Sequence, residues 1–122
     1  MKKKNETATT AGNLGEWEEY LLDELNASRK ELADEKQTAN PTVYARRSKL
    51  FSQSAYILET VSLGQNTGTF LKDYITEVDL PSRLESEIHE VITDYEGAEP
   101  EIYMQRLQLL NNLRNYIAKL LA

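Results

Sequence analysis

Cysteine is absent from the 122-residue chain, and histidine occurs once, at His89. Without cysteine the protein can form neither a disulfide nor a thiolate metal site. A single imidazole also excludes metal sites that need two histidines. The remaining polar chemistry belongs to carboxylates, amines, guanidinium groups, amides and hydroxyls. We therefore expect no catalytic residues, no metal and no cofactor.

Long apolar runs are also missing. The first 13 residues, MKKKNETATTAGN, begin with bases but continue without the apolar stretch that a signal peptide needs. No 18-residue apolar run is present to span a membrane. The sequence predicts a cytoplasmic protein with a disordered tail at residues 1–13 and one domain at residues 14–122.

Basic residues are outnumbered, because 14 Lys and Arg face 20 Asp and Glu for a formal charge of −6. Such a charge disfavours simple attraction to nucleic acid or anionic lipid. The charges are also segregated along the chain. Acids dominate residues 14–37 and 73–101, whereas residues 38–58 and 102–122 contain bases and no acid.

Apolar residues recur at helical spacing throughout, and no segment shows the alternation typical of strands. Predicted helices cover residues 14–36, 41–63, 68–79, 82–95 and 100–122. Asn40 is a suitable N-cap, Pro41 suits the first helical position, and Gly64 suits a left-handed C-terminal position. The segment Leu80-Pro81 should interrupt the third helix, and the capping box Ser82-Arg83-Leu84-Glu85 should start the fourth.

The segment 100–122 is apolar over roughly half its circumference, wider than the stripe of an ordinary surface helix. Such a helix must contact at least two neighbours, so the other helices should pack around it. Short connections favour an antiparallel up-down-up-down bundle of four rods, with the third broken at Leu80-Pro81. This all-α arrangement places acidic rods beside basic rods, with surface ion pairs worth about 0–1 kcal/mol each.

Two arginines fall within apolar helix faces, namely Arg47 and Arg106. A buried guanidinium group needs a carboxylate partner, and Glu18 and Glu77 border neighbouring apolar faces. The favoured interpretation is that each arginine extends along the surface to reach water near a helix end. An internal ion pair and an interface with a partner are the alternatives.

The first part of helix 41–63 suggests a nucleic-acid contact, because residues 41–58 combine aromatic, basic and amide side chains without acids. The residues concerned are Tyr44, Arg46, Arg47, Lys49 and Gln53. Because this helix contributes only three bases and the chain as a whole is acidic, a nucleic-acid-associated subunit is the alternative function. A second alternative is an enzyme built on Arg83 and His89. Residues six apart on one helix point about 120° away from each other, however, so these two do not converge.

The main expectation is a small acidic protein that acts through protein–protein contacts, as an inhibitor, immunity-type or regulatory or assembly protein. One candidate surface is acidic and consists of Asp73, Glu77, Glu85, Glu87, Glu90 and Asp94. The other lies on the segment 100–122, includes Tyr103, Arg106 and Tyr116, and would allow a homodimer. The partner's identity and the oligomeric state are left open by the sequence.

Overall fold

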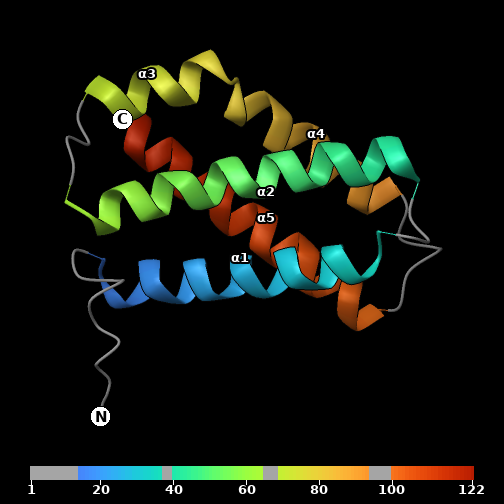
Figure 1. Cartoon of the computed structure of the whole chain (residues 1–122). Helices are drawn as coiled ribbons and strands as arrows, with labels where there is room; N and C mark the ends of the chain where they lie inside the picture. Colours follow the sequence, from blue (N-terminus) through green and yellow to red (C-terminus); the bar gives the residue numbers. More distant parts are fainter. Residues whose placement is uncertain (1–13, 37–39, 65–68, 94–99) are drawn as a thin grey trace, which may run out of the picture.

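The structure is a computed structural model that describes residues 14–36, 40–64, 69–93 and 100–122. All regular secondary structure in these ranges is helical, which confirms the all-α prediction. The five helices are α1 (Glu16–Asp34), α2 (Pro41–Ser62), α3 (Thr69–Glu77), α4 (Leu80–Thr93) and α5 (Pro100–Leu121) (Figure 1). The predicted tail at residues 1–13 and Asp94 lie outside the described residues.

The ends of α2 follow the local sequence signals. The Oδ1 atom of Asn40 accepts hydrogen bonds from the backbone N–H groups of Thr42 at 2.9 Å and Val43 at 3.2 Å. Pro41 occupies the first helical position, where its missing N–H group has no intrahelical partner to lose. Gly64 follows the helix with a φ of 70°. The predicted N-cap and left-handed C-terminal glycine of α2 are therefore confirmed.

Replacing Gly64 with alanine should lower the free energy of unfolding by about 1 kcal/mol, because a Cβ atom is strained in the left-handed region. Asparagine tolerates this conformation better than alanine, so Gly64→Asn should be less destabilising. Urea unfolding of the three proteins gives the comparison. Equal stability of Gly64 and the alanine variant would contradict a left-handed conformation at this position.

The break between α3 and α4 lies earlier than the sequence predicts. Asp79, with a φ of 56°, changes the chain direction, and α4 already begins at Leu80 instead of Ser82. Pro81 is accommodated in the first turn, where a helix needs no N–H donor. Leu80 precedes a proline but is completely buried, and this burial favours its helical placement. The predicted capping box at Ser82 is therefore wrong.

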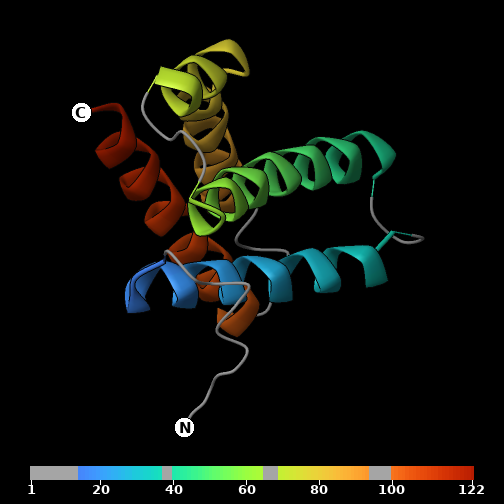
Figure 2. The same cartoon turned by 60° about the vertical axis from the view of Figure 1, so that its left-hand side comes forward.

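The helices α1 and α2 pack side by side and run in opposite directions, while α5 crosses them obliquely (Figures 1 and 2). Helix α5 contacts α1, α3 and α4, and α4 also contacts α2. These neighbours account for the broad apolar arc of α5 and confirm the prediction that it needs at least two. The regular up-down-up-down alignment of four rods stays a prediction.

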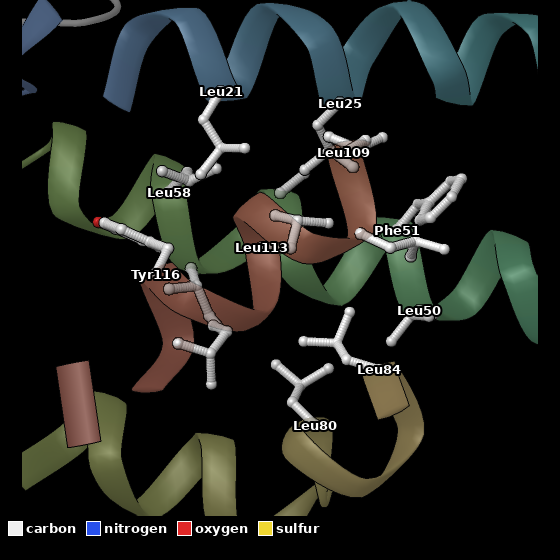
Figure 3. Close-up of a cluster of buried hydrophobic side chains, with 14 of the residues drawn as sticks. Leu21, Leu25, Leu50, Phe51, Leu58, Leu80, Leu84, Leu109, Leu113 and Tyr116 are labelled. Carbon is white, nitrogen blue, oxygen red and sulfur yellow. The ribbon is translucent and has the colours of Figure 1, made fainter. Parts of the chain in front are cut away.

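Buried leucines from separate helices meet along α5. Figure 3 shows Leu21 and Leu25 of α1 pointing towards Leu109 and Leu113 of α5. The same core receives Leu50, Phe51 and Leu58 from α2 and Leu80 and Leu84 from α4. Burial of these side chains, at about 25 cal/mol per Å² of apolar surface, is the main force that holds the helices in place.

Candidate functional site

The bases of α2 form ion pairs with acids of α4. Glu87 is only 2% exposed, and its carboxylate accepts hydrogen bonds from the Nε atoms of Arg46, at 3.3 Å, and Arg47. The Nη2 atom of Arg46 also donates to Glu90 at 2.5 Å. Two guanidinium groups therefore enclose one buried carboxylate between two helices, an arrangement that satisfies its hydrogen-bonding requirement.

This cluster corrects two expectations. Arg47 forms an internal ion pair, and its partner is Glu87 instead of Glu18 or Glu77. Because Glu87 is buried, it does not belong to the exposed acidic surface in which the sequence placed it. The apolar stripe of α4 contains Leu84, Ile88 and Val91, and Glu87 lies within that stripe.

The other inward arginine, Arg106 on α5, pairs with Glu35 just after the end of α1. Glu18 and Glu77 are again not the partner. Both members of this pair are partly exposed, so it is a boundary contact between α1 and α5 rather than a fully buried charge pair. Arg114 of α5 similarly pairs with Glu85 of α4 at 2.9 Å, where both side chains remain well exposed.

The acidic surface expected on α3 and α4 is largely occupied by these internal pairs. Glu85 pairs with Arg114, and Glu90 pairs with Arg46. Asp73 and Glu77 remain exposed, without an ion pair to any residue in the described part of the chain. Of the α5 residues expected to contact a partner, Tyr103 and Arg106 are half-buried and Tyr116 is buried.

A different acidic surface lies on the first half of α1. We call it the acidic-aromatic face, and it consists of Glu16, Trp17, Glu19, Tyr20, Asp23 and Glu24. All six residues are exposed, with Trp17 at 46% and Tyr20 at 47%. They lie on the exposed side of α1, with Trp17 at the edge of this side, next to the apolar side that contains Leu21 and Leu25. The first base in α1 is Arg29, so this face combines four carboxylates and two aromatic rings with no cation.

Contacts with α5 hold Trp17 in position. Its ring centroid lies 6.0 Å from that of Tyr116, at an interplanar angle of 47°. The hydroxyl group of Tyr116 donates a hydrogen bond of 2.7 Å to Glu18. Burial raises the pKa of Tyr116 well above its usual range, and the hydrogen bond to Glu18 adds to this shift. Through the hydrogen bond to Glu18 and the ring contact with Trp17, Tyr116 fixes the start of α1 against α5.

Most of the α2 residues that suggested a nucleic-acid contact interact with other residues of the same chain or are partly buried. Arg47, whose side chain is 14% exposed, and Arg46 are engaged by Glu87 and Glu90. Gln53 accepts a 2.5 Å hydrogen bond from Arg83. Lys49 is exposed, whereas Tyr44 is half-buried. The structure thus leaves Lys49 as the one base of this set with no carboxylate partner within the described ranges.

Basic residues line two of the larger surface clefts in the described part of the molecule. One, of about 470 Å³, lies between α2 and the α3–α4 junction and is lined by Arg46, Lys49, Gln53, Glu77, Val78 and Arg83. The other, of about 310 Å³, lies between α1 and α2 and is lined by Asn26, Arg29, Lys30, Leu32, Ala33, Tyr44, Ser48 and Ser52. The first cleft includes the acid Glu77, and its Arg46 is already paired with Glu87 and Glu90. Among the described residues that line the α1–α2 cleft, none is an acid.

No group of three His, Asp or Glu side chains in the described ranges is placed to hold a metal ion. His89 is exposed, and Arg83 donates to Gln53 and, at 3.1 Å, to the backbone carbonyl of Val78. None of the described helices is both long and apolar enough to cross a membrane. No protein-family model, curated protein or solved structure matches the chain.

Proposed function

We propose that the protein is a small non-catalytic binding module that recognises a basic polypeptide surface through the acidic-aromatic face of α1. The observation that supports this proposal most directly is the exposure of Trp17 and Tyr20 among four carboxylates. Tryptophan and tyrosine are the residues that most often dominate binding energy at protein interfaces. Lysine and arginine side chains on a partner would satisfy both the carboxylates and the aromatic rings.

The fixed position of the Trp17 ring also favours the acidic-aromatic face as the binding surface. Trp17 packs against Tyr116, and Tyr116 is hydrogen-bonded to Glu18, so the indole ring is oriented before a partner arrives. A side chain that is already ordered loses less conformational entropy on binding, and this saving increases affinity. By contrast, Glu85, Glu87 and Glu90 on α4 are engaged by arginines of the same chain. We therefore propose that the acidic surface that binds the partner lies on α1 and not on α4.

Intrinsic fluorescence offers a direct test, because Trp17 is the only tryptophan in the sequence. Titration with a short peptide of alternating arginine and leucine should change the emission of Trp17 in a saturable manner. A peptide in which glutamine replaces each arginine should leave the emission unchanged. The affinity for the basic peptide should fall as the salt concentration rises, because exposed charges are screened.

Two charge variants separate a local site from the effect of net charge. Changing Glu16, Glu19, Asp23 and Glu24 to their amides should weaken binding at least about tenfold in calorimetric titrations. A control that changes Glu31, Asp34, Asp73 and Glu77 to their amides alters the net charge equally and should retain the affinity. Equal weakening by both variants, with helicity retained in both, would show non-specific attraction and refute the proposed site.

A further inference from the structure

The polar cleft between α1 and α2 is lined by side chains suited to an anion. Its volume of about 310 Å³ is at the small end of the range for ligand pockets. The helices that form it separate towards the end of α1 and the start of α2 (Figure 2). Arg29 and Lys30 line one wall, and Leu32 and Ala33 add apolar surface. None of the described residues that line the cleft is an acid, although α1 as a whole is strongly acidic.

The two cations of this cleft, Arg29 and Lys30, lack an ion-pair partner among the residues that the structure describes. Arg29 instead donates from Nη1 to the neutral amide oxygen of Asn26 at 3.2 Å. This contact orients the guanidinium group and leaves its other N–H donors available. Arginine with free donors is well suited to bind phosphate oxygens through paired hydrogen bonds.

The opposite wall supplies three hydroxyl groups in a row. Tyr44, Ser48 and Ser52 are spaced four residues apart on α2, so each follows the previous one by about one helical turn. Each hydroxyl can donate one hydrogen bond and accept others. The row therefore matches a ligand that has an oxyanion at one point and hydroxyl groups beside it.

We propose that the α1–α2 cleft binds a small phosphate ester, with Arg29 and Lys30 holding the phosphate group and the α2 hydroxyls contacting the rest of the molecule. This site is separate from the acidic-aromatic face, because it uses the second half of α1 and the first half of α2. A small ligand is favoured over a nucleic acid, because the bases Arg46 and Arg47 that would extend a phosphate-binding surface along α2 are paired with acids.

Nuclear magnetic resonance of the ¹⁵N-labelled protein can locate binding residue by residue. Addition of glycerol 3-phosphate should shift the backbone signals of Arg29, Lys30, Ser48 and Ser52 and the side-chain amide of Asn26, with saturation below about 10 mM. Glycerol should cause no saturable shift at these positions. Inorganic phosphate should shift the signals of Arg29 and Lys30 with weaker affinity, because it lacks the carbon chain that reaches the hydroxyl groups.

Matched variants provide the control. Arg29→Gln and Lys30→Gln should each weaken glycerol 3-phosphate binding about tenfold, since each removes a charge-assisted hydrogen bond. Lys72→Gln and Lys119→Gln remove the same charge from exposed positions on α3 and α5 and should leave the affinity unchanged. The proposal is overturned if no saturable shift occurs below 10 mM, if all four variants weaken binding equally, or if a single-stranded oligonucleotide binds while the ester does not.

Discussion

Replacing Glu87 with leucine is expected to lower the free energy of unfolding by about 3 kcal/mol, because the change leaves the side chain of Arg47 without its buried carboxylate partner. The Arg47 side chain is 14% exposed and has little access to water. This loss of stability should lie near the low end of the range of about 3–5 kcal/mol that is typical when a buried ion pair is broken. Glu90 still approaches Arg47 at 3.9 Å, and the more exposed Arg46 can turn towards solvent.

Two further variants test the cause of this loss by urea unfolding. Glu85, on the same helix as Glu87, forms an exposed pair with Arg114 of α5, and Glu85→Gln should cost less than about 1 kcal/mol. Combining Arg47→Met with Glu87→Leu replaces the charge pair by apolar side chains and should recover much of the stability lost in Glu87→Leu alone. A double variant as unstable as the sum of its single variants would contradict a direct coupling between Arg47 and Glu87.

Leu113→Ala in the middle of α5 is expected to cost about 3–4 kcal/mol, because a leucine replaced in a packed core loses its transfer free energy and leaves a cavity. Leu113 is fully buried and lies among leucines from α1 and α2 (Figure 3). A loss of this size is a large part of the 5–15 kcal/mol that stabilises a typical domain. Thermal unfolding should accordingly show a markedly lower midpoint.

Met104→Ala is the matched control on the same helix. Met104 is 58% exposed, so its replacement should change the stability by less than about 0.5 kcal/mol. If Leu113→Ala were as mild as this control, α5 would not occupy the centre of the core. If Met104→Ala were as costly as Leu113→Ala, its side chain would be buried in solution, which would indicate self-association through α5.

The helices could be predicted from the sequence because their signals are local. Asn40, Pro41 and Gly64 mark the ends of α2 through backbone geometry that each residue type favours on its own. The broad apolar arc of α5 likewise predicted several neighbouring helices, and α5 contacts α1, α3 and α4. The start of α4 was displaced because burial of Leu80 outweighs the local preference of a residue that precedes proline.

The partners of the arginines could not be predicted, because a helical wheel shows which side a residue faces but not which residue of another helix lies opposite. Arg47 reaches Glu87, forty residues later in the chain, through the register between α2 and α4. The sequence did contain one usable signal. Glu87 follows Leu84 by three residues and precedes Val91 by four, so it falls on the apolar stripe of α4, where a carboxylate needs a cation.

The candidate binding face was missed for a different reason. Trp17 is at the edge of the apolar side of α1, where the sequence alone does not distinguish a core residue from an exposed one. Glu16 and Glu19 have an ordinary explanation at the start of a helix, where the dipole favours negative charge. Only the placement of Tyr116 on the adjacent α5 shows that Trp17 is held at the surface with nearly half of it exposed.

The central position of α5 also has a consequence for how the chain folds during synthesis. The ribosome releases α1 to α4 before α5, so the parts of their apolar faces that pack on α5 are in water until residues 100–121 emerge. The hydrogen bond between Tyr116 and Glu18 spans 98 residues of sequence, and contacts of such long range slow the search for the native state. We therefore expect the nascent chain to be most prone to aggregation in the interval before its fifth helix is released.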